Sequence, residues 1–123
     1  MAKKKIMLID DEQNILELVS ELLSNEGYDV ITTGSGREAL EKLKTAKPDL
    51  ILLDMMMPNM SGRQVCEAIR KNSKTKNLRI AFLTVAKFSE AGKEKLNELK
   101  VLDYITKPFD NQDLVERVKK ILK

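Results

Sequence analysis

Five side chains that could take part in chemistry follow short apolar runs of strand length. They are the carboxylates of Asp10, Asp11 and Asp54, the hydroxyl of Thr84 and the ammonium of Lys107. The run before Asp54, residues 50–53, contains no polar residue, which is typical of a central strand in a parallel sheet. Because the carboxyl ends of parallel strands share one edge, we expect these side chains to meet in one crevice.

Three carboxylates in one crevice repel one another. At a separation of about 5 Å and an effective dielectric constant of about 20, each pair costs roughly 3 kcal/mol. A hard divalent cation removes this cost, and Mg²⁺ suits the cluster because it prefers oxygen ligands and keeps several waters. The competing interpretation is structural, with Asp10 or Asp11 capping a helix and Asp54 lying exposed or in a turn. It explains any single residue better than it explains the whole set at matching strand ends.

The elements that would position these residues alternate along the chain. Strands are predicted at residues 4–10, 28–33, 50–53, 79–85 and 101–106. Apolar stripes predict helices around residues 15–23, 39–46, 65–69, 89–99 and 114–122, the fourth being the weakest because Gly92 lies inside it. Ser35 with Glu38 and Ser61 with Gln64 match the capping box, and Asp110 suits the start of the last helix.

Five strands alternating with five helices predict one α/β domain over residues 1–123, with a doubly wound parallel sheet and right-handed crossovers. The second and fifth strands are the more polar, so we place them at the edges. The flavodoxin-like strand order 2-1-3-4-5 meets this requirement and leaves a crevice between the first and third strands.

The amino-acid composition argues against several classes of function. The formal charge is +3, from 22 basic and 19 acidic residues, and aromatic residues are few, so we expect no direct contact with nucleic acid. No apolar run approaches the length of a membrane span, so we expect a cytoplasmic protein without membrane insertion. There is no histidine, which excludes His-based acid–base catalysis. The single cysteine, Cys66, lies on an apolar stripe and is interpreted as a packing residue.

The pattern resembles the receiver domain of two-component response regulators, in the single-domain form of the chemotaxis regulators. The resemblance covers essentially the whole chain and depends on Asp10-Asp11, Asp54 with Pro58 and Gly62 downstream, Thr84, and Lys107-Pro108. It implies that Asp54 accepts a phosphoryl group from the phosphohistidine of a sensor histidine kinase or phosphotransfer protein. It also implies that Asp10, Asp11, Asp54 and the main-chain carbonyl of Met56 bind Mg²⁺.

The same resemblance implies that Thr84 and Lys107 contact the phosphoryl oxygens and that the Lys107–Pro108 bond is cis. Tyr104 matches an aromatic residue that moves inward with Thr84 on activation. The readout surface for a downstream protein would be the helix at 89–99, the strand at 101–106 and the last helix. Phosphorylation could also produce a dimer. The chain would then be a regulator rather than an enzyme, catalysing only its own phosphoryl transfer and slow dephosphorylation.

Some residues depart from the family pattern. Val85 stands where receivers more often carry Ala or Gly, and neither Met56 nor Ala86 offers a polar group to orient an attacking water, which predicts slow self-dephosphorylation. The stretch Leu99-Lys100-Val101 lacks the Gly-Ala pair common before the fifth strand.

Three alternative functions stay open at this point. A degenerate receiver would act only as a protein-binding module, which the intact acidic set argues against. A phosphatase of the haloacid dehalogenase kind would use Asp-x-Asp after the first strand, where this chain has Asp10-Asp11-Glu12. A flavodoxin-like cofactor site would need a phosphate-binding loop after the first strand, and none is present.

Overall fold

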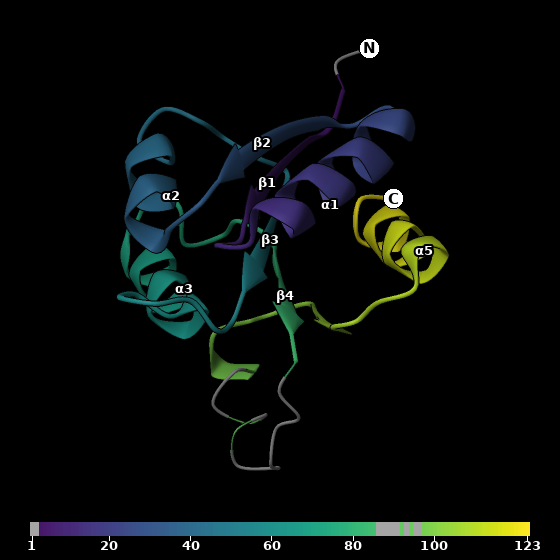
Figure 1. Ribbon diagram of the computed structural model, residues 1–123. Helices are drawn as coiled ribbons and strands as arrows, with labels where there is room; N and C mark the ends of the chain where they lie inside the picture. The colour runs from purple at the N-terminus through teal and green to yellow at the C-terminus, as the bar shows by residue number, and fades with distance from the viewer. Residues whose placement is uncertain (1–2, 86–91, 93, 95–96) are drawn as a thin grey trace.

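Five parallel strands form the sheet of the computed structural model, which describes residues 3–85, 92, 94 and 97–123 (Figure 1). The strand order is β2-β1-β3-β4-β5, as predicted, and every neighbouring pair is parallel. The strands are β1 (Lys5–Ile9), β2 (Asp29–Thr33), β3 (Leu50–Asp54), β4 (Ile80–Thr84) and β5 (Asp103–Thr106).

Four helices cover the two faces of the sheet within the described residues. They are α1 (Gln13–Asn25), α2 (Gly36–Lys42), α3 (Gly62–Lys71) and α5 (Asn111–Ile121). Helices α2 and α3 lie on one face, and α1 and α5 lie on the other (Figure 1). Five helices were predicted; the fourth, over residues 89–99, lies mostly outside the described residues, so four stand in the part of the chain that the structure describes.

The core divides into two layers because successive strand residues point to opposite faces. On β3, Ile51 and Leu53 pack toward α2 and α3, whereas Leu50 and Leu52 pack toward α1 and α5. All four side chains are fully buried, which confirms the prediction of a strand covered on both faces. Cys66 lies buried in the first of these layers and is a packing residue, as predicted.

The helix starts match the sequence in part. Ser61 and Gln64 form a complete capping box at α3. At α2 the Ser35 hydroxyl accepts from the Glu38 amide, but the Glu38 carboxylate accepts from the Gly34 amide instead of that of Ser35, so this box is incomplete. At α1 the cap residue is Glu12, whose side chain makes no capping bond.

Arg70, near the end of α3, ties two loops together at the amino edge of the sheet. Its guanidinium donates to the carbonyls of Lys76 and Leu78 before β4, and of Leu99 and Lys100 before β5. Lys100 adopts a φ of 57°, in the left-handed region. At the turn where the receiver resemblance implies glycine, the lysine therefore adopts a conformation that glycine favours.

We expect Lys100→Gly to stabilise the protein by about 0.5 kcal/mol, because glycine adopts a positive φ without a Cβ penalty. Urea unfolding measures the effect. Lys76→Gly is the matched control, since its carbonyl also accepts from Arg70 but its φ is not positive. That control should lose stability, and an equal loss in both variants would contradict the assignment of strain to Lys100.

Candidate functional site

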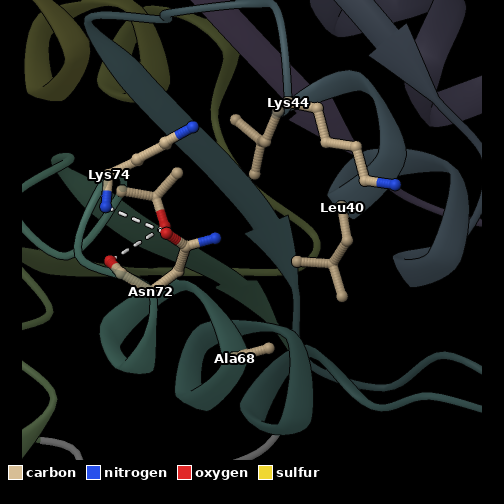
Figure 2. Close-up of a pocket in the computed structure, with 7 residues that line it drawn as sticks. Leu40, Lys44, Ala68, Asn72 and Lys74 are labelled. Atoms are coloured by element: carbon tan, nitrogen blue, oxygen red, sulfur yellow. Dashed lines mark hydrogen bonds between the residues drawn. The ribbon is translucent and has the colours of Figure 1, made fainter.

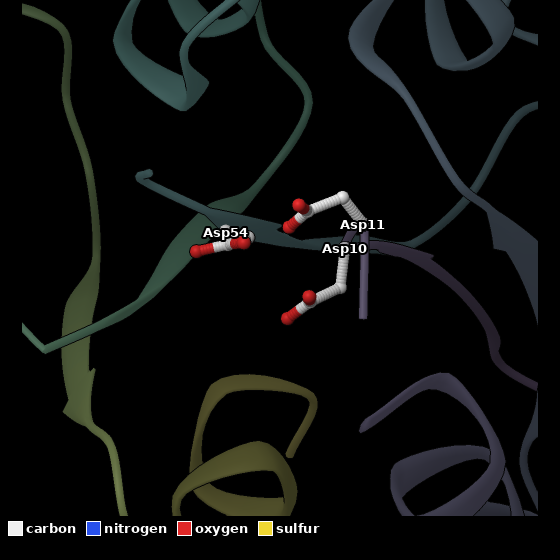
Figure 3. A group of neighbouring side chains, drawn as sticks. All are labelled: Asp10, Asp11 and Asp54. Atoms are coloured by element: carbon white, nitrogen blue, oxygen red, sulfur yellow. The ribbon is translucent and has the colours of Figure 1, made fainter. Parts of the chain in front are cut away.

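Three carboxylates meet at the carboxyl edge of the sheet, between β1 and β3. Asp10 follows β1, Asp11 comes next, and Asp54 is the last residue of β3. One oxygen atom from each carboxylate lies within 4.8 Å of the others, and Figure 3 shows the side chains converging. Asp10 and Asp54 are buried and Asp11 is exposed, so the cluster has a buried floor and an open side. The predicted convergence of these residues is confirmed.

Lys107 supplies the positive charge of the site. It follows β5, and its side chain is only 8% exposed. Its Nζ lies 2.7 Å from Asp10 Oδ2 and 3.5 Å from Asp54 Oδ1. One ammonium thus bridges the two buried carboxylates and offsets part of their repulsion. The Lys107–Pro108 peptide bond is cis, as the resemblance implied.

Glu12 also reaches this site, which the sequence reasoning did not anticipate. Its carboxylate lies 3.5 Å from Lys107 Nζ, and its main-chain amide donates to Asp10 Oδ1 at 2.9 Å. The available signal was its position directly after the acidic pair Asp10-Asp11. Because the Glu12 side chain is 61% exposed, its charge adds little to the stability of the folded chain.

The close approach of α3 to β3 determines the position of the Asp54 backbone. The Gly62 amide donates to the Met55 carbonyl at 3.0 Å. A Cβ at Gly62 would lie 2.2 Å from the Asp54 carbonyl oxygen and 2.8 Å from the Met55 Cα. Only glycine fits this contact, which gives a physical reason for the downstream glycine of the motif.

Burial together with the charges of the cluster raises the pKa of Asp54 to about 7. Burial is the main cause and the negative charge of Asp10 adds to it, while Lys107 and a hydrogen bond from the Met56 amide act in the opposite direction. For Lys107, burial alone would lower the pKa, but the bond to Asp10 and the charges of Asp10, Asp54 and Glu12 outweigh it and raise the pKa. The site therefore has a deficit of positive charge that a cation would correct.

This shift makes the stability of the metal-free protein depend on pH. The pKa of Asp54 is higher in the folded chain than the ordinary value of 3.8, so its contribution to stability is complete below pH 3.8 and is lost as the pH rises through about 7. We expect Asp54→Asn to stabilise the metal-free protein by about 2 kcal/mol more at pH 8 than at pH 5. Urea unfolding in EDTA across this range measures it, and a pH-independent effect would contradict the raised pKa.

Thr84 lies on β4, the strand next to β3, and Tyr104 lies on β5, one strand farther out. Thr84 ends β4 and is buried, and its carbonyl accepts from the Lys107 amide at 2.8 Å. Tyr104, on β5, stacks on Phe82 of β4 with 6.3 Å between ring centroids, and its hydroxyl oxygen is buried. Burial raises the pKa of this phenol. Both residues lie on the strands predicted for them, β4 beside the strand of Asp54 and β5 beyond it.

Two exposed side chains stand next to the reactive groups in the chain. Met56, two residues after Asp54, and Val85, directly after Thr84, are each 63% exposed. Met55 and Met57 are instead buried in the layer under α2 and α3. The run of three methionines thus contributes two packing residues and one surface residue.

The comparison with known proteins agrees with this geometry. The family model described as the response regulator receiver domain matches residues 6–119. The chain therefore belongs to the response regulator receiver family of two-component signalling. Receiver domains are generally signalling modules rather than enzymes, and they take phosphoryl groups from histidine kinases.

Individual relatives show the same family at closer range. The alkaline phosphatase synthesis transcriptional regulatory protein PhoP of Bacillus subtilis is 43% identical over 120 residues, covering 98% of this chain and 49% of that protein. The probable transcriptional regulator ycf27 of Porphyridium aerugineum is 38% identical over 123 residues, covering all of this chain and 50% of that protein. This chain thus spans about half the length of the curated relatives it matches.

Solved structures reproduce the fold over nearly the whole chain. The chemotaxis protein CheY4 of Vibrio cholerae superposes with a TM-score of 0.90 at 32% identity, covering 98% of this chain and 99% of that chain. A putative response regulator from Chloroflexus aurantiacus gives 0.87 at 34% identity, with 98% of each chain covered. Among the residues that the structure describes, no helix has the length and apolar character to cross a lipid bilayer.

Proposed function

We propose that this chain is a phosphoacceptor switch in which Asp54 takes a phosphoryl group from a partner histidine kinase or phosphotransfer protein. One observation carries the proposal: three carboxylates from the ends of β1 and β3 converge within 4.8 Å beside a buried lysine, in a chain of the receiver family. A structural role alone does not account for this cluster, because the arrangement costs energy that capping or packing does not return.

The donor set fits Mg²⁺. Mg²⁺ binds oxygen ligands at about 2.1 Å in an octahedron, so ligands on opposite sides are about 4.2 Å apart. Adjacent ligands are about 3 Å apart, so the three carboxylate oxygens, which lie within 4.8 Å of one another, would have to close in on the ion by up to about 2 Å. Asp10, Asp11, Asp54 and the main-chain carbonyl of Met56 would hold the ion. When bound, it would neutralise charge on the transferred phosphoryl group.

Three residues of the chain then have separate roles in the phosphoryl transfer. One oxygen of ionised Asp54 forms the bond to phosphorus as the bond to the donor's imidazole nitrogen breaks, and that electron pair stays with the imidazole. Lys107, already 3.5 Å from Asp54 Oδ1, would pair with a phosphoryl oxygen, and the Thr84 hydroxyl would donate to another. Both donors come from the carboxyl ends of strands, at the sheet edge that carries Asp54.

Tyr104 and Thr84 would transmit the change to a partner protein. The new charge at Asp54 would draw Thr84 toward it and favour the inward position of Tyr104 against β4. The surface on β5 and α5 would then bind a downstream protein or a second copy, together with residues 89–99, which lie mostly outside the described residues. The Arg117 guanidinium couples these two elements through Asp103 on β5, at 2.8 Å. A cytoplasmic location stays a prediction.

The experiment is incubation with Mg²⁺ and acetyl phosphate, followed by intact mass. One added phosphoryl group is expected, and Asp54→Asn should abolish it, whereas Asp29→Asn, an exposed control on β2, should not. No mass gain together with no Mg²⁺ binding would favour the binding-module alternative. Steady turnover of a generic phosphate ester would favour the phosphatase alternative.

Two curated relatives are described as transcriptional regulators and are about twice as long. For the described residues we propose a protein partner and no direct nucleic-acid contact. A longer protein that contained this chain would be compatible with nucleic-acid binding by its other part.

We expect the phosphoryl group to be lost slowly. Val85 and Met56 are exposed beside the site, and neither side chain can orient an attacking water. Val85→Ala should open the approach to phosphorus and shorten the half-life of the phosphorylated protein several-fold, as followed by intact mass after removal of the donor. An unchanged half-life in both Val85→Ala and Met56→Asn would show that these side chains do not limit hydrolysis.

A further inference from the structure

A groove opens between the ends of α2 and α3 that lie farthest from the carboxylate cluster. Helix α3 begins against Asp54 at Gly62 and ends at Lys71, and a rise of 1.5 Å per residue places its end about 15 Å away. The groove has a volume of about 390 Å³, near the lower end of the range of ligand sites. It is therefore separate from the phosphoacceptor site.

The floor of the groove is apolar. Leu40 and Leu43 come from α2 and its end, and Ala68 comes from α3. Leu40 and Ala68 are only half-buried, although Leu40 packs against the core layer beneath it. These side chains keep contact area for another apolar group, whose burial would contribute about 25 cal/mol per Å² of area removed from water.

The rim of the groove is cationic. Lys44 and Lys74 line it, and no described lining residue is acidic. Lys44 lies 2.9 Å from Glu41, but both side chains are about 70% exposed (69% and 72%), so this ion pair is weak and easily exchanged. Figure 2 shows Leu40 and Lys44 on one side of the groove and Ala68, Asn72 and Lys74 on the other.

The polar groups at the α3 end already have partners. The Thr75 hydroxyl, which is buried, donates to the Ile69 carbonyl at 2.7 Å. The Asn72 side-chain oxygen accepts from the Lys74 amide at 2.9 Å (Figure 2). These bonds hold the loop after α3 in place, so the groove is formed before any ligand arrives and its floor offers few free polar groups.

We propose that the α2–α3 groove docks an acidic amphipathic segment of a partner protein. Its apolar side chains would cover Leu40, Leu43 and Ala68, and its carboxylates would pair with Lys44 and Lys74. Nucleic acid fits less well, because the floor is aliphatic, the lining contains no aromatic side chain for base stacking and no arginine, and only two cations face it. The proposal does not depend on phosphorylation of Asp54.

The test is an NMR titration of ¹⁵N-labelled protein with a synthetic helical peptide that carries leucines on one face and glutamates beside them. We expect amide shifts at residues 40–45 and 68–75. A peptide with lysines in place of the glutamates should bind at least fivefold more weakly. Lys44→Glu with Lys74→Glu should reduce the affinity for the glutamate peptide by a similar factor. Lys3→Glu with Lys120→Glu changes the net charge equally at exposed positions and is the matched control.

Filling the groove gives a second variant that leaves the charge unchanged. Ala68→Gln should also weaken the glutamate peptide, while thermal unfolding confirms that it folds. Shifts centred on other surfaces, equal binding of the two peptides, or equal losses in the groove and control charge variants would overturn the proposal. The acetyl phosphate reaction of the groove variants should match that of the unmodified protein, which separates this proposal from the proposed function.

Discussion

Gly62→Ala is expected to destabilise the protein by about 3 kcal/mol, which lowers the midpoint of thermal unfolding by roughly 10 °C. The added Cβ would lie 2.2 Å from the Asp54 carbonyl oxygen and 2.8 Å from the Met55 Cα. Both are backbone atoms, so no rotation of a side chain can relieve the clash. Either α3 must move away from β3, losing the Gly62–Met55 hydrogen bond, or the end of β3 must shift.

The same displacement should impair the site, because Asp54 stands on the backbone that moves. We expect the initial rate of phosphorylation by acetyl phosphate to fall about tenfold or more in the fraction that stays folded, since a shift of about 1 Å can cost that much in rate. Gly34→Ala is the matched control: its Cβ would come no closer than 4.0 Å to Glu38, so it should change neither quantity. Equal stability of the two variants would show that the contact at Gly62 is not tight in solution.

Lys107→Met is expected to destabilise the metal-free protein by about 3 kcal/mol at pH 8. Methionine keeps most of the side-chain volume but removes the ammonium that lies 2.7 Å from Asp10 and 3.5 Å from Asp54. Two buried carboxylates then face each other without a counter-charge. Because Lys107 also holds down the pKa of Asp54, its loss should raise that pKa further.

Protonation of Asp54 relieves the repulsion, so the defect of Lys107→Met should shrink as the pH falls toward 5. Magnesium should stabilise Lys107→Met more than the unmodified protein, since the ion no longer competes with the ammonium. Urea unfolding with and without Mg²⁺ at both pH values measures these effects. Lys120→Met, an exposed position on α5, is the control and should be neutral. A defect of equal size at both pH values would mean that lost packing, rather than charge, is responsible.

Local chemistry was sufficient to predict most of the fold. The apolar run of β3, the polar edge strands β2 and β5, and the capping residues at Ser61 and Asp110 are local signals, and the structure has the elements that they indicate. The alternation of strands and helices then restricted the sheet to parallel connections of one hand, and the polar character of the second and fifth strands favoured the observed strand order. The convergence of Asp10, Asp11, Asp54 and Lys107 was predictable for the same reason.

Contacts between residues far apart in the chain could not be predicted in this way. Glu12 reaches Lys107, 95 positions later in numbering (12 to 107), and Arg70 binds carbonyls of residues 76 to 100; neither pairing leaves a periodic or capping signal. The incomplete capping box at Ser35 has a similar cause. The Glu38 carboxylate can accept from the amide of Gly34 or of Ser35, and in the structure it accepts from Gly34. The groove between α2 and α3 depends on where two helices diverge, which side-chain packing decides.

The order of residue types along the chain thus determined which elements form and which sheet edge carries the reactive groups, because hydrophobic period and capping act within a few residues. Tertiary packing determined the distances, burial and charge balance of those reactive groups. Burial of Asp10 and Asp54 around one lysine, and the glycine contact under Asp54, depend on distances between strands and helices. Such distances are set only when the whole core is packed, since the field at each carboxylate is the sum of charges and solvent exclusion from several elements.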